Sequence, residues 1–190
     1  MTSAWPAVMA AAIAVALSVP PLRRVIEQSM AWHMVFQMPL LVLAGALAAR
    51  ALPGLRLHAR WSSFNVFGLA GFMAAQGVIA YWMLPVAIDR AVVNPGFDVL
   101  KLLTLYASGV LLHDAFRRAP ATLQLFFIGY WVSMMCWLGV YFATTYLRLC
   151  NAYSLESQLA TGRGLLALGL VLGIVWMGNL WQKAMRKPAV

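Results

Sequence analysis

One short stretch, residues 29–39, carries the chain's densest group of side chains that could bind a metal through sulfur or nitrogen. If the stretch is helical, Met30, His33, Met34 and Gln37 follow the i, i+3, i+4, i+7 spacing and share one face. Thioether and imidazole groups suit a soft ion such as cuprous copper, and they suit zinc or magnesium poorly. The stretch therefore suggests one wall of a soft-metal site.

The opposite wall is expected on the third hydrophobic run, which ends in Tyr81-Trp82-Met83-Leu84-Pro85. With His33 near the outer membrane face, Met83 would lie at the same depth. The candidate metal ligands are then Met30, His33, Met34, Met38 and Met83. Packing is the alternative reading, because the chain has 11 Met and methionine commonly fills gaps in apolar interiors.

Two charged residues lie inside the fourth run, where Asp98 and Lys101 are spaced i, i+3 on one helix face. A charge at that depth is costly unless it is paired or reaches the interface. The simpler interpretation is an Asp98–Lys101 ion pair. The alternative is a polar vestibule above residues 29–39, lined by Asp89, Asp98 and Lys101.

The other histidines do not extend this site. His58 lies in a basic loop and is expected near lipid headgroups, whereas His113 is expected at the opposite end of the membrane from His33. One haem could not take both as axial ligands, although His/Met ligation stays open. Met134, Met135 and Cys136 fall in the middle of the fifth run, where packing is favoured over a metal relay. The sequence has no nucleophile–base pair, phosphate loop or CxxC motif, and we do not predict an enzyme.

Composition indicates how these side chains are held. The chain is 63% hydrophobic, has a mean hydropathy of +0.80, and has only 10% charged residues. A soluble domain of 190 residues could not bury that much apolar surface. We therefore predict an all-α integral membrane protein. The net charge of +9 comes from residues between the hydrophobic runs, which fits membrane topology and anionic headgroups better than nucleic-acid binding.

Six hydrophobic runs predict a single bundle of about six transmembrane helices over residues 1–190. The runs are about 4–22, 28–49, 62–88, 96–113, 120–147 and 159–182. The first lacks a basic leader region and is read as a retained helix. Loop Lys and Arg residues number eight on the side of the termini and five on the other, which favours cytoplasmic termini.

Four stretches, in order, resemble the CtaG-type cytochrome c oxidase assembly factors over about residues 28–182. Residues 32–41, WHMVFQMPLL, resemble that family's H-M-x-x-H-M motif. Residues 81–85 with Asp89 resemble its Trp-His-x-Pro element and trailing Asp. Asn94-Pro95-Gly96 resembles the following segment, and residues 155–162, LESQLATG, resemble its Asp-Gln…Gly element.

The chain departs from this pattern at three positions. Gln37 replaces the motif's second histidine, Met83 replaces the histidine of the Trp-His element, and Ser157 replaces the acidic residue before Gln158. Met83 keeps a soft ligand, whereas Gln37 is a poor one.

The resemblance implies a bacterial inner-membrane protein that helps deliver copper to a haem-copper oxidase. Its partners would be an oxidase subunit or a copper chaperone, and Gln37 and Asp89 would lie behind the metal ligands. The competing hypothesis is a metal-free interaction or scaffold subunit that uses the aromatic fifth run and the outer loops. A small transporter or a haem-binding membrane protein is a weaker alternative.

Overall fold

The structure, a computed structural model, describes residues 5–51 and 63–185, and every regular element in these ranges is a helix. The elements are α1 Trp5–Ser18, α2 Pro20–Ile26, η1 Trp32–Gln37, α3 Met38–Ala51, α5 Leu69–Trp82, α6 Pro85–Val93, α7 Pro95–Arg118, α8 Ala121–Thr144 and α9 Leu155–Met185. Element η1 is a π-helix that continues directly into α3. His58 lies outside the described residues.

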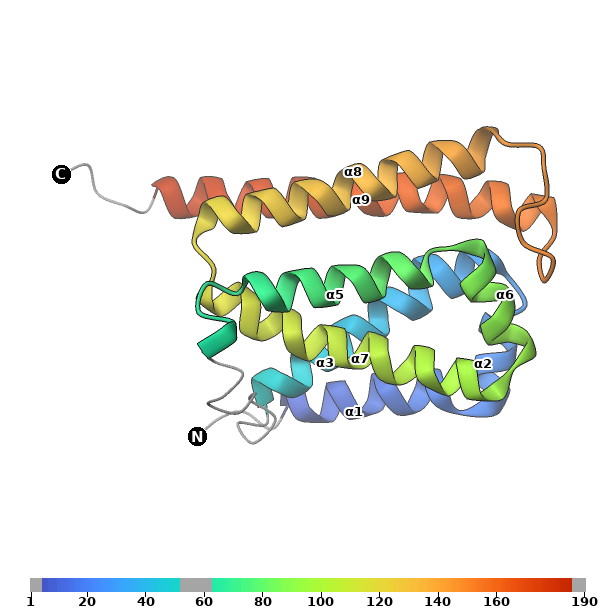
Figure 1. Cartoon of the computed structure of the whole chain (residues 1–190), viewed down its shortest axis with the longest axis horizontal. Helices are drawn as coiled ribbons and strands as arrows, with labels where there is room; N and C mark the ends of the chain where they lie inside the picture. The colour runs from blue at the N-terminus through green and yellow to red at the C-terminus, as the bar shows by residue number, and fades with distance from the viewer. Residues whose placement is uncertain (1–4, 52–62, 186–190) are drawn as a thin grey trace.

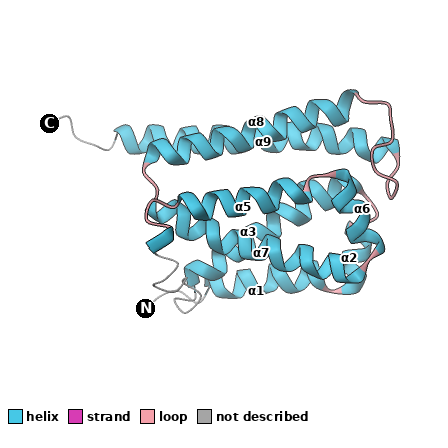
Figure 2. Ribbon diagram, viewed as in Figure 1, coloured by secondary structure: helices cyan, strands magenta, loops and turns pink. Residues whose placement is uncertain are grey.

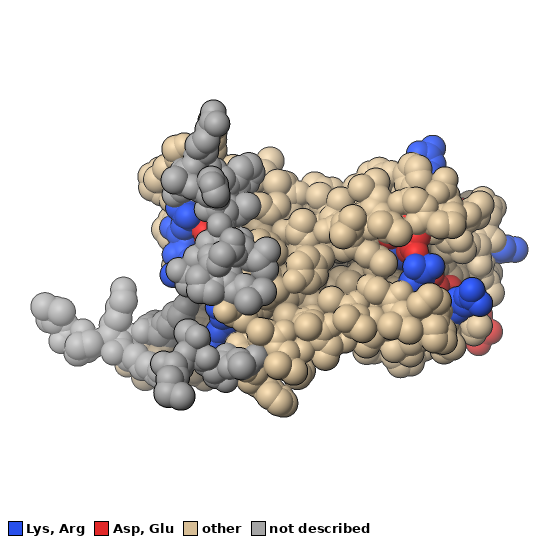
Figure 3. Space-filling model, turned by 90° about the horizontal axis from the view of Figure 1, so that it is seen from below, with Lys and Arg blue, Asp and Glu red and all other residues tan. Residues whose placement is uncertain are grey.

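The prediction of an all-α membrane bundle is confirmed. In the described ranges, four helices are long and apolar enough to cross a membrane, or six if each of two bent helix pairs makes one crossing. Lys, Arg, Asp and Glu side chains gather near the two ends of the face in Figure 3 and leave a broad belt without charged side chains between them. Such a belt is what a bilayer requires of the surface that it contacts.

The helices form two layers (Figure 1). In the first layer α3 packs between α1 and α7, and α7 also packs on α5. The second layer is the α8–α9 hairpin, which is closed by a long loop at the end of the molecule that carries α2 and α6 (Figure 2). We call this end the α2–α6 end. Helix α1 begins and α9 ends at the opposite end, as an even number of crossings requires.

Prolines break the first and third predicted runs. The residue before a proline is driven out of the helical region, and Val19 and Leu84 are extended, with ψ of 125° and 132°. Helices α1 and α2 meet at 73°, and α5 and α6 at 72°. The prediction of one long helix over residues 62–88 was therefore wrong, because the chain turns at Pro85.

Glycines set the closest helix contacts. A Cβ added at Gly109 would lie 1.9 Å from the Val42 carbonyl oxygen, and one at Gly45 would lie 1.9 Å from that of Tyr106. Gly139 and Gly162 make a similar close contact between α8 and α9. Small residues let membrane helices approach closely enough for extensive van der Waals contact. The packing inside each layer therefore depends on these glycines.

Aromatic side chains join the two layers away from the α2–α6 end. Phe72 of α5 stacks on Phe127 of α8 with ring centroids 4.6 Å apart. Phe116 of α7 and Trp131 of α8 meet Phe72 edge-on, at 4.9 and 6.4 Å. These rings form one buried cluster. The second buried cluster, rich in methionine, lies closer to the α2–α6 end and is described next.

Candidate functional site

Lys101 is the centre of a buried polar network at the α2–α6 end. Its side chain is completely buried. Its Nζ lies 2.8 Å from Asp98 Oδ1, 2.9 Å from Glu27 Oε1 and 2.8 Å from His33 Nε2. An ammonium can only donate hydrogen bonds; Nζ is hydrogen-bonded to Glu27 and His33, and its contact with Asp98 is an ion pair without hydrogen-bond geometry. The predicted Asp98–Lys101 pair is present, but it belongs to a larger network.

Arg23 completes the charge balance of this network. Its guanidinium lies 2.7 Å from Asp98 Oδ2 and 3.6 Å from Glu27 Oε2. Two cations and two carboxylates therefore sit together, with no net charge among the four. Neutrality and direct pairing are the conditions under which charges are tolerated inside a membrane protein. Arg23 and Glu27 form the partly exposed rim, and Asp98 and Lys101 form the interior.

Both ring nitrogens of His33 are already engaged. Because the Lys101 ammonium can only donate, His33 accepts at Nε2 and keeps its own proton on Nδ1. Nδ1 lies 2.6 Å from the Tyr153 hydroxyl and donates to it. Burial, with a smaller contribution from the charge of Glu27, raises the pKa of Tyr153, so this phenol stays protonated. His33 thus has no free lone pair for a metal ion.

Gln37 faces the same network rather than a metal ligand. Its Nε2 donates weakly to the Leu17 carbonyl at 3.4 Å and to Glu27 Oε1 at 3.5 Å. The amide is fully buried, and its Oε1 has no hydrogen-bond partner among the described residues. The π-helical turn of η1 carries both Gln37 and His33. Such turns are rare and frequently occur at functional sites.

Asp89 lies apart from the Lys101 network and holds a loop. Its carboxylate accepts hydrogen bonds from the backbone N–H groups of Asn151 at 2.9 Å and Ala152 at 3.1 Å. The adjacent Cys150 is buried, and this burial together with the Asp89 charge raises the pKa of its thiol to about 12. Asp89 therefore joins α6 to the α8–α9 loop and does not line a vestibule with Asp98 and Lys101.

The stretch LESQLATG also serves this loop. Gln158 Oε1 accepts from the Leu149 N–H at 2.9 Å, and Gln158 Nε2 donates to the Leu147 carbonyl at 3.1 Å. Ser157 Oγ accepts from the Met30 N–H at 2.8 Å, which attaches the start of α9 to the residues before η1. Ser157 and Gln158 of this motif therefore hold the α8–α9 loop and the residues before η1 in place.

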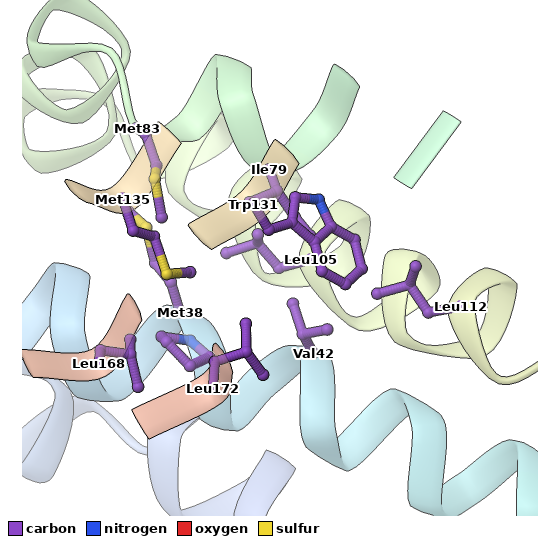
Figure 4. Close-up of a pocket in the computed structure, with 11 residues that line it drawn as sticks. Met38, Val42, Ile79, Met83, Leu105, Leu112, Trp131, Met135, Leu168 and Leu172 are labelled. Carbon is purple, nitrogen blue, oxygen red and sulfur yellow. The ribbon is translucent and has the colours of Figure 1, made fainter. Parts of the chain in front are cut away.

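The predicted methionines divide into two groups. Met30 and Met34 are fully buried in the apolar core. Met38 and Met83 instead line a cavity of about 190 Å³ together with Met135 of α8. In Figure 4 the side chains of these three methionines converge at one end of the cavity. Here we name this group the methionine end of the cavity.

The cavity lies between the two layers. Besides the three methionines it is lined by Pro39, Val42, Ile79, Leu105, Leu112, Trp131, Leu168 and Leu172. These residues come from α3, α5, α7, α8 and α9. Apart from the methionine sulfurs and the indole nitrogen of Trp131, their side chains are hydrocarbon. A soft ion or an apolar molecule is the chemistry that such a lining suits.

Within the described ranges, no group of three or more His, Cys, Asp or Glu side chains could hold a metal ion. His113 lies twelve residues after Lys101 on α7, about 18 Å along the helix, so it is remote from His33. Cys136 packs against α9, with its Sγ 3.5 Å from a Cβ built at Gly169. Among the predicted metal ligands in the described ranges, Met38 and Met83 are the ones that line the cavity.

Three residues of this region, Arg23, Glu27 and Tyr153, were not predicted from the sequence. Arg23 and Glu27 carried a signal, because they are an i, i+4 pair of opposite charge next to the first run. Tyr153 carried none, since it reaches the site from a distant segment. Met135 was considered only in a possible metal relay with Cys136, where packing was favoured. A scan against protein-family models, a search of curated proteins and a search of solved structures found no match to this chain.

Proposed function

We propose that this chain is a CtaG-like membrane protein that holds cuprous copper during the assembly of a haem-copper oxidase. The observation that carries the proposal is the convergence of Met38, Met83 and Met135 on one cavity (Figure 4). Thioethers from α3, from the turn after α5 and from α8 provide a soft, neutral ligand set, which favours cuprous copper over harder ions. The proposal also draws on the ordered motifs between residues 28 and 182.

The proposed site uses sulfur only. Copper at His33 would have to displace Lys101 or Tyr153 from the imidazole, and displacing Lys101 would leave the carboxylates of Glu27 and Asp98 without their shared cation. That rearrangement is expensive for buried charges. Met83 stands where the CtaG-type motif has a histidine, and it keeps a soft ligand at that position. The Lys101 network then holds the helices that present the thioethers.

The proposed setting is a bacterial inner membrane with both termini in the cytoplasm. The Lys101 network would then lie toward the outer face, where copper is handed on. An oxidase subunit or a copper chaperone is the proposed partner. The start of α1 and the end of α9 lie at the same end of the molecule (Figure 1), which supports placing both termini on one side of the membrane.

A titration of the purified protein with cuprous ion against a coloured cuprous chelator tests the copper site. We expect Met83→Leu and Met135→Leu each to weaken binding by at least tenfold, because each removes one of three ligands. Met73→Leu is the matched control, since Met73 is 60% exposed on α5. Equal binding by all four proteins would contradict the proposal. Loss of binding in His33→Ala alone would move the site to η1.

A scaffold function without metal is the second candidate. It is favoured by the aromatic side chains exposed on α8, which include Phe126 at 65% and Trp137 at 68%. Such side chains contact lipid or a partner helix. This candidate predicts that Phe126→Leu together with Trp137→Leu reduces co-purification of a partner, whereas Met83→Leu does not. An absorption spectrum of the purified protein, with or without a Soret band, decides the haem alternative.

A further inference from the structure

A surface cleft at the α2–α6 end shares no lining residue with the methionine cavity or the Lys101 network. Its volume is about 590 Å³, which is within the usual range of ligand pockets. Helix α6, the start of α7 and the α8–α9 loop form its walls. Its polar lining residues are Asp89, Arg90, Asn94 and Asn151. The cleft therefore offers charged groups to a ligand from outside the bundle.

The cleft lies at the level of the lipid headgroups. Helix α5 ends at Trp82, α7 begins at Pro95, and α6 runs between these two helix ends (Figure 1). The bend of 72° between α5 and α6 turns α6 across the end of the bundle. Val86 and Val93, which also line the cleft, are 62% and 81% exposed on α6. Exposed apolar side chains beside an arginine are typical of a helix at the membrane interface.

The cleft holds two opposite charges that do not pair with each other. The Asp89 carboxylate accepts hydrogen bonds from the N–H groups of Asn151 and Ala152, which are neutral donors. Within the described residues, no cation pairs with Asp89, and the Arg90 side chain has no hydrogen bond or ion pair. Consecutive helix residues do not face each other, so the carboxylate and the guanidinium stay apart and remain available to one ligand.

A ligand that matches both groups carries an anion and a cation a few bonds apart. A carboxylate has about four acceptor sites, and Asn151 and Ala152 use three of those on Asp89, which leaves one open on Oδ1. A guanidinium is well suited to binding a phosphate through paired N–H donors. The phosphate and the primary ammonium of an ethanolamine phospholipid meet both requirements. Phosphate alone would leave the charge of Asp89 without a partner.

We propose that this cleft binds the headgroup of phosphatidylethanolamine. The Arg90 guanidinium donates to the phosphate, and the ammonium of the lipid donates to Asp89 Oδ1. Val86 and Val93 contact the glycerol and the adjoining part of the acyl chains. A bilayer lipid is the occupant, rather than a soluble phosphoethanolamine compound, because these exposed valines accompany the charges at the end of the helices. The inference concerns a separate site and does not depend on copper binding.

Three lipids with identical acyl chains and different headgroups test the proposal. Phosphatidylglycerol has no amine, and phosphatidylcholine has a cation without an N–H donor. Native mass spectrometry of the delipidated, metal-free, full-length protein in detergent measures the dissociation constant of the first lipid bound. We expect phosphatidylethanolamine to bind about tenfold more tightly than either of the others, since each lacks the hydrogen bond between charged groups at Asp89. Soluble glycerophosphoethanolamine should not displace the lipid at equal concentration.

Substitutions separate the two contacts. We expect Arg90→Gln to weaken binding of phosphatidylethanolamine about tenfold, because the phosphate loses its cationic donor. Asp89→Asn should remove the preference over phosphatidylglycerol, and thermal unfolding checks that the loop bound by Asp89 is still folded. Arg24→Gln is the matched control, since Arg24 is an exposed arginine of α2 at the same end, and it should bind like the wild type.

Equal affinity of the wild type for the three lipids would overturn the proposal, because it would show that the cleft contacts any phospholipid. Wild-type affinity of Arg90→Gln for phosphatidylethanolamine would overturn it as well. Displacement of the lipid by an equal concentration of glycerophosphoethanolamine would make the ligand a soluble compound and contradict the lipid assignment. None of these results bears on the copper titration, since no metal is present.

Discussion

The Lys101 network and the methionine end of the cavity are both buried, yet they use polar chemistry in opposite ways. Lys101 has three acceptors within 2.9 Å, and His33 has a partner on each ring nitrogen. The thioethers of Met38, Met83 and Met135 instead line open volume. Hydrogen bonds join Lys101 to Glu27 and His33, and an ion pair joins it to Asp98, whereas no hydrogen bond engages the thioether sulfurs of the cavity among the described residues.

This difference shows that a histidine among methionines need not be a metal ligand. The imidazole of His33 is held by an ammonium and a phenol that arrive from α7 and from the loop before α9. In the network the charged groups pair with one another, and these pairs fix the arrangement of α2, η1 and α7. In the cavity the sulfur atoms keep their lone pairs available. Function is therefore more readily placed in the cavity, and structural support in the network.

Removing the central cation should break the network most severely. We expect Lys101→Met to lower the free energy of unfolding by about 3–5 kcal/mol, because it leaves Glu27 and Asp98 as buried carboxylates without their shared cation. Thermal unfolding of the detergent-solubilised protein measures this loss. Arg24→Gln, exposed on α2, is the control and should melt like the wild type. A wild-type melting temperature for Lys101→Met would refute a structural role for the network.

The helix packing beside the cavity can be tested at Gly109, where α7 meets α3. We expect Gly109→Ala to cost about 1–3 kcal/mol, because its Cβ would overlap the carbonyl of Val42, which lines the cavity. Gly77→Ala on α5 is the matched control, since its Cβ meets nothing within 4 Å. Thermal unfolding in detergent compares the two. Equal stability of the two variants would show that α3 and α7 do not approach as closely as described.

Loss of the hydrogen bond between Tyr153 and His33 should lower stability less than loss of Lys101. Tyr153→Phe removes one hydrogen bond to His33 Nδ1 and keeps the ring, so we expect a loss of about 1 kcal/mol. Tyr146→Phe should have no effect, because Tyr146 is 82% exposed. The same thermal unfolding experiment detects the difference. If both variants matched the wild type, the His33–Tyr153 bond would contribute nothing measurable.

The smallest effect is expected at Cys150, beside Asp89. Its pKa is raised from 9.0 to about 12, so the folded protein holds this proton more tightly than the unfolded chain does. The stability that depends on this proton is fully present below pH 9 and is lost as the pH rises toward 12.

Maleimide labelling of a Cys136→Ser variant measures the same shift. Because the thiolate is the reactive form, labelling of the folded protein should stay slow up to pH 10. The chain in denaturant should react with a midpoint near pH 9. Similar midpoints in both states would contradict the burial of Cys150.

Much of the membrane architecture follows from local sequence. Composition and the length of the apolar runs predicted an all-α membrane bundle, since a bilayer requires such runs. The i, i+3 spacing of Asp98 and Lys101 predicted their ion pair. The bend at Pro85 was missed, although the conformational restriction on Leu84 is itself a local signal.

The site was decided by tertiary structure. Lys101 reaches His33 across 68 positions of sequence, and Tyr153 reaches it across 120. Such contacts depend on how each helix is rotated and bent, which local periodicity does not determine. By itself the sequence placed a histidine and several methionines at one depth in a membrane. Packing within the first layer places the Lys101 ammonium against the His33 imidazole, and packing of the two layers leaves the methionine sulfur atoms facing a cavity.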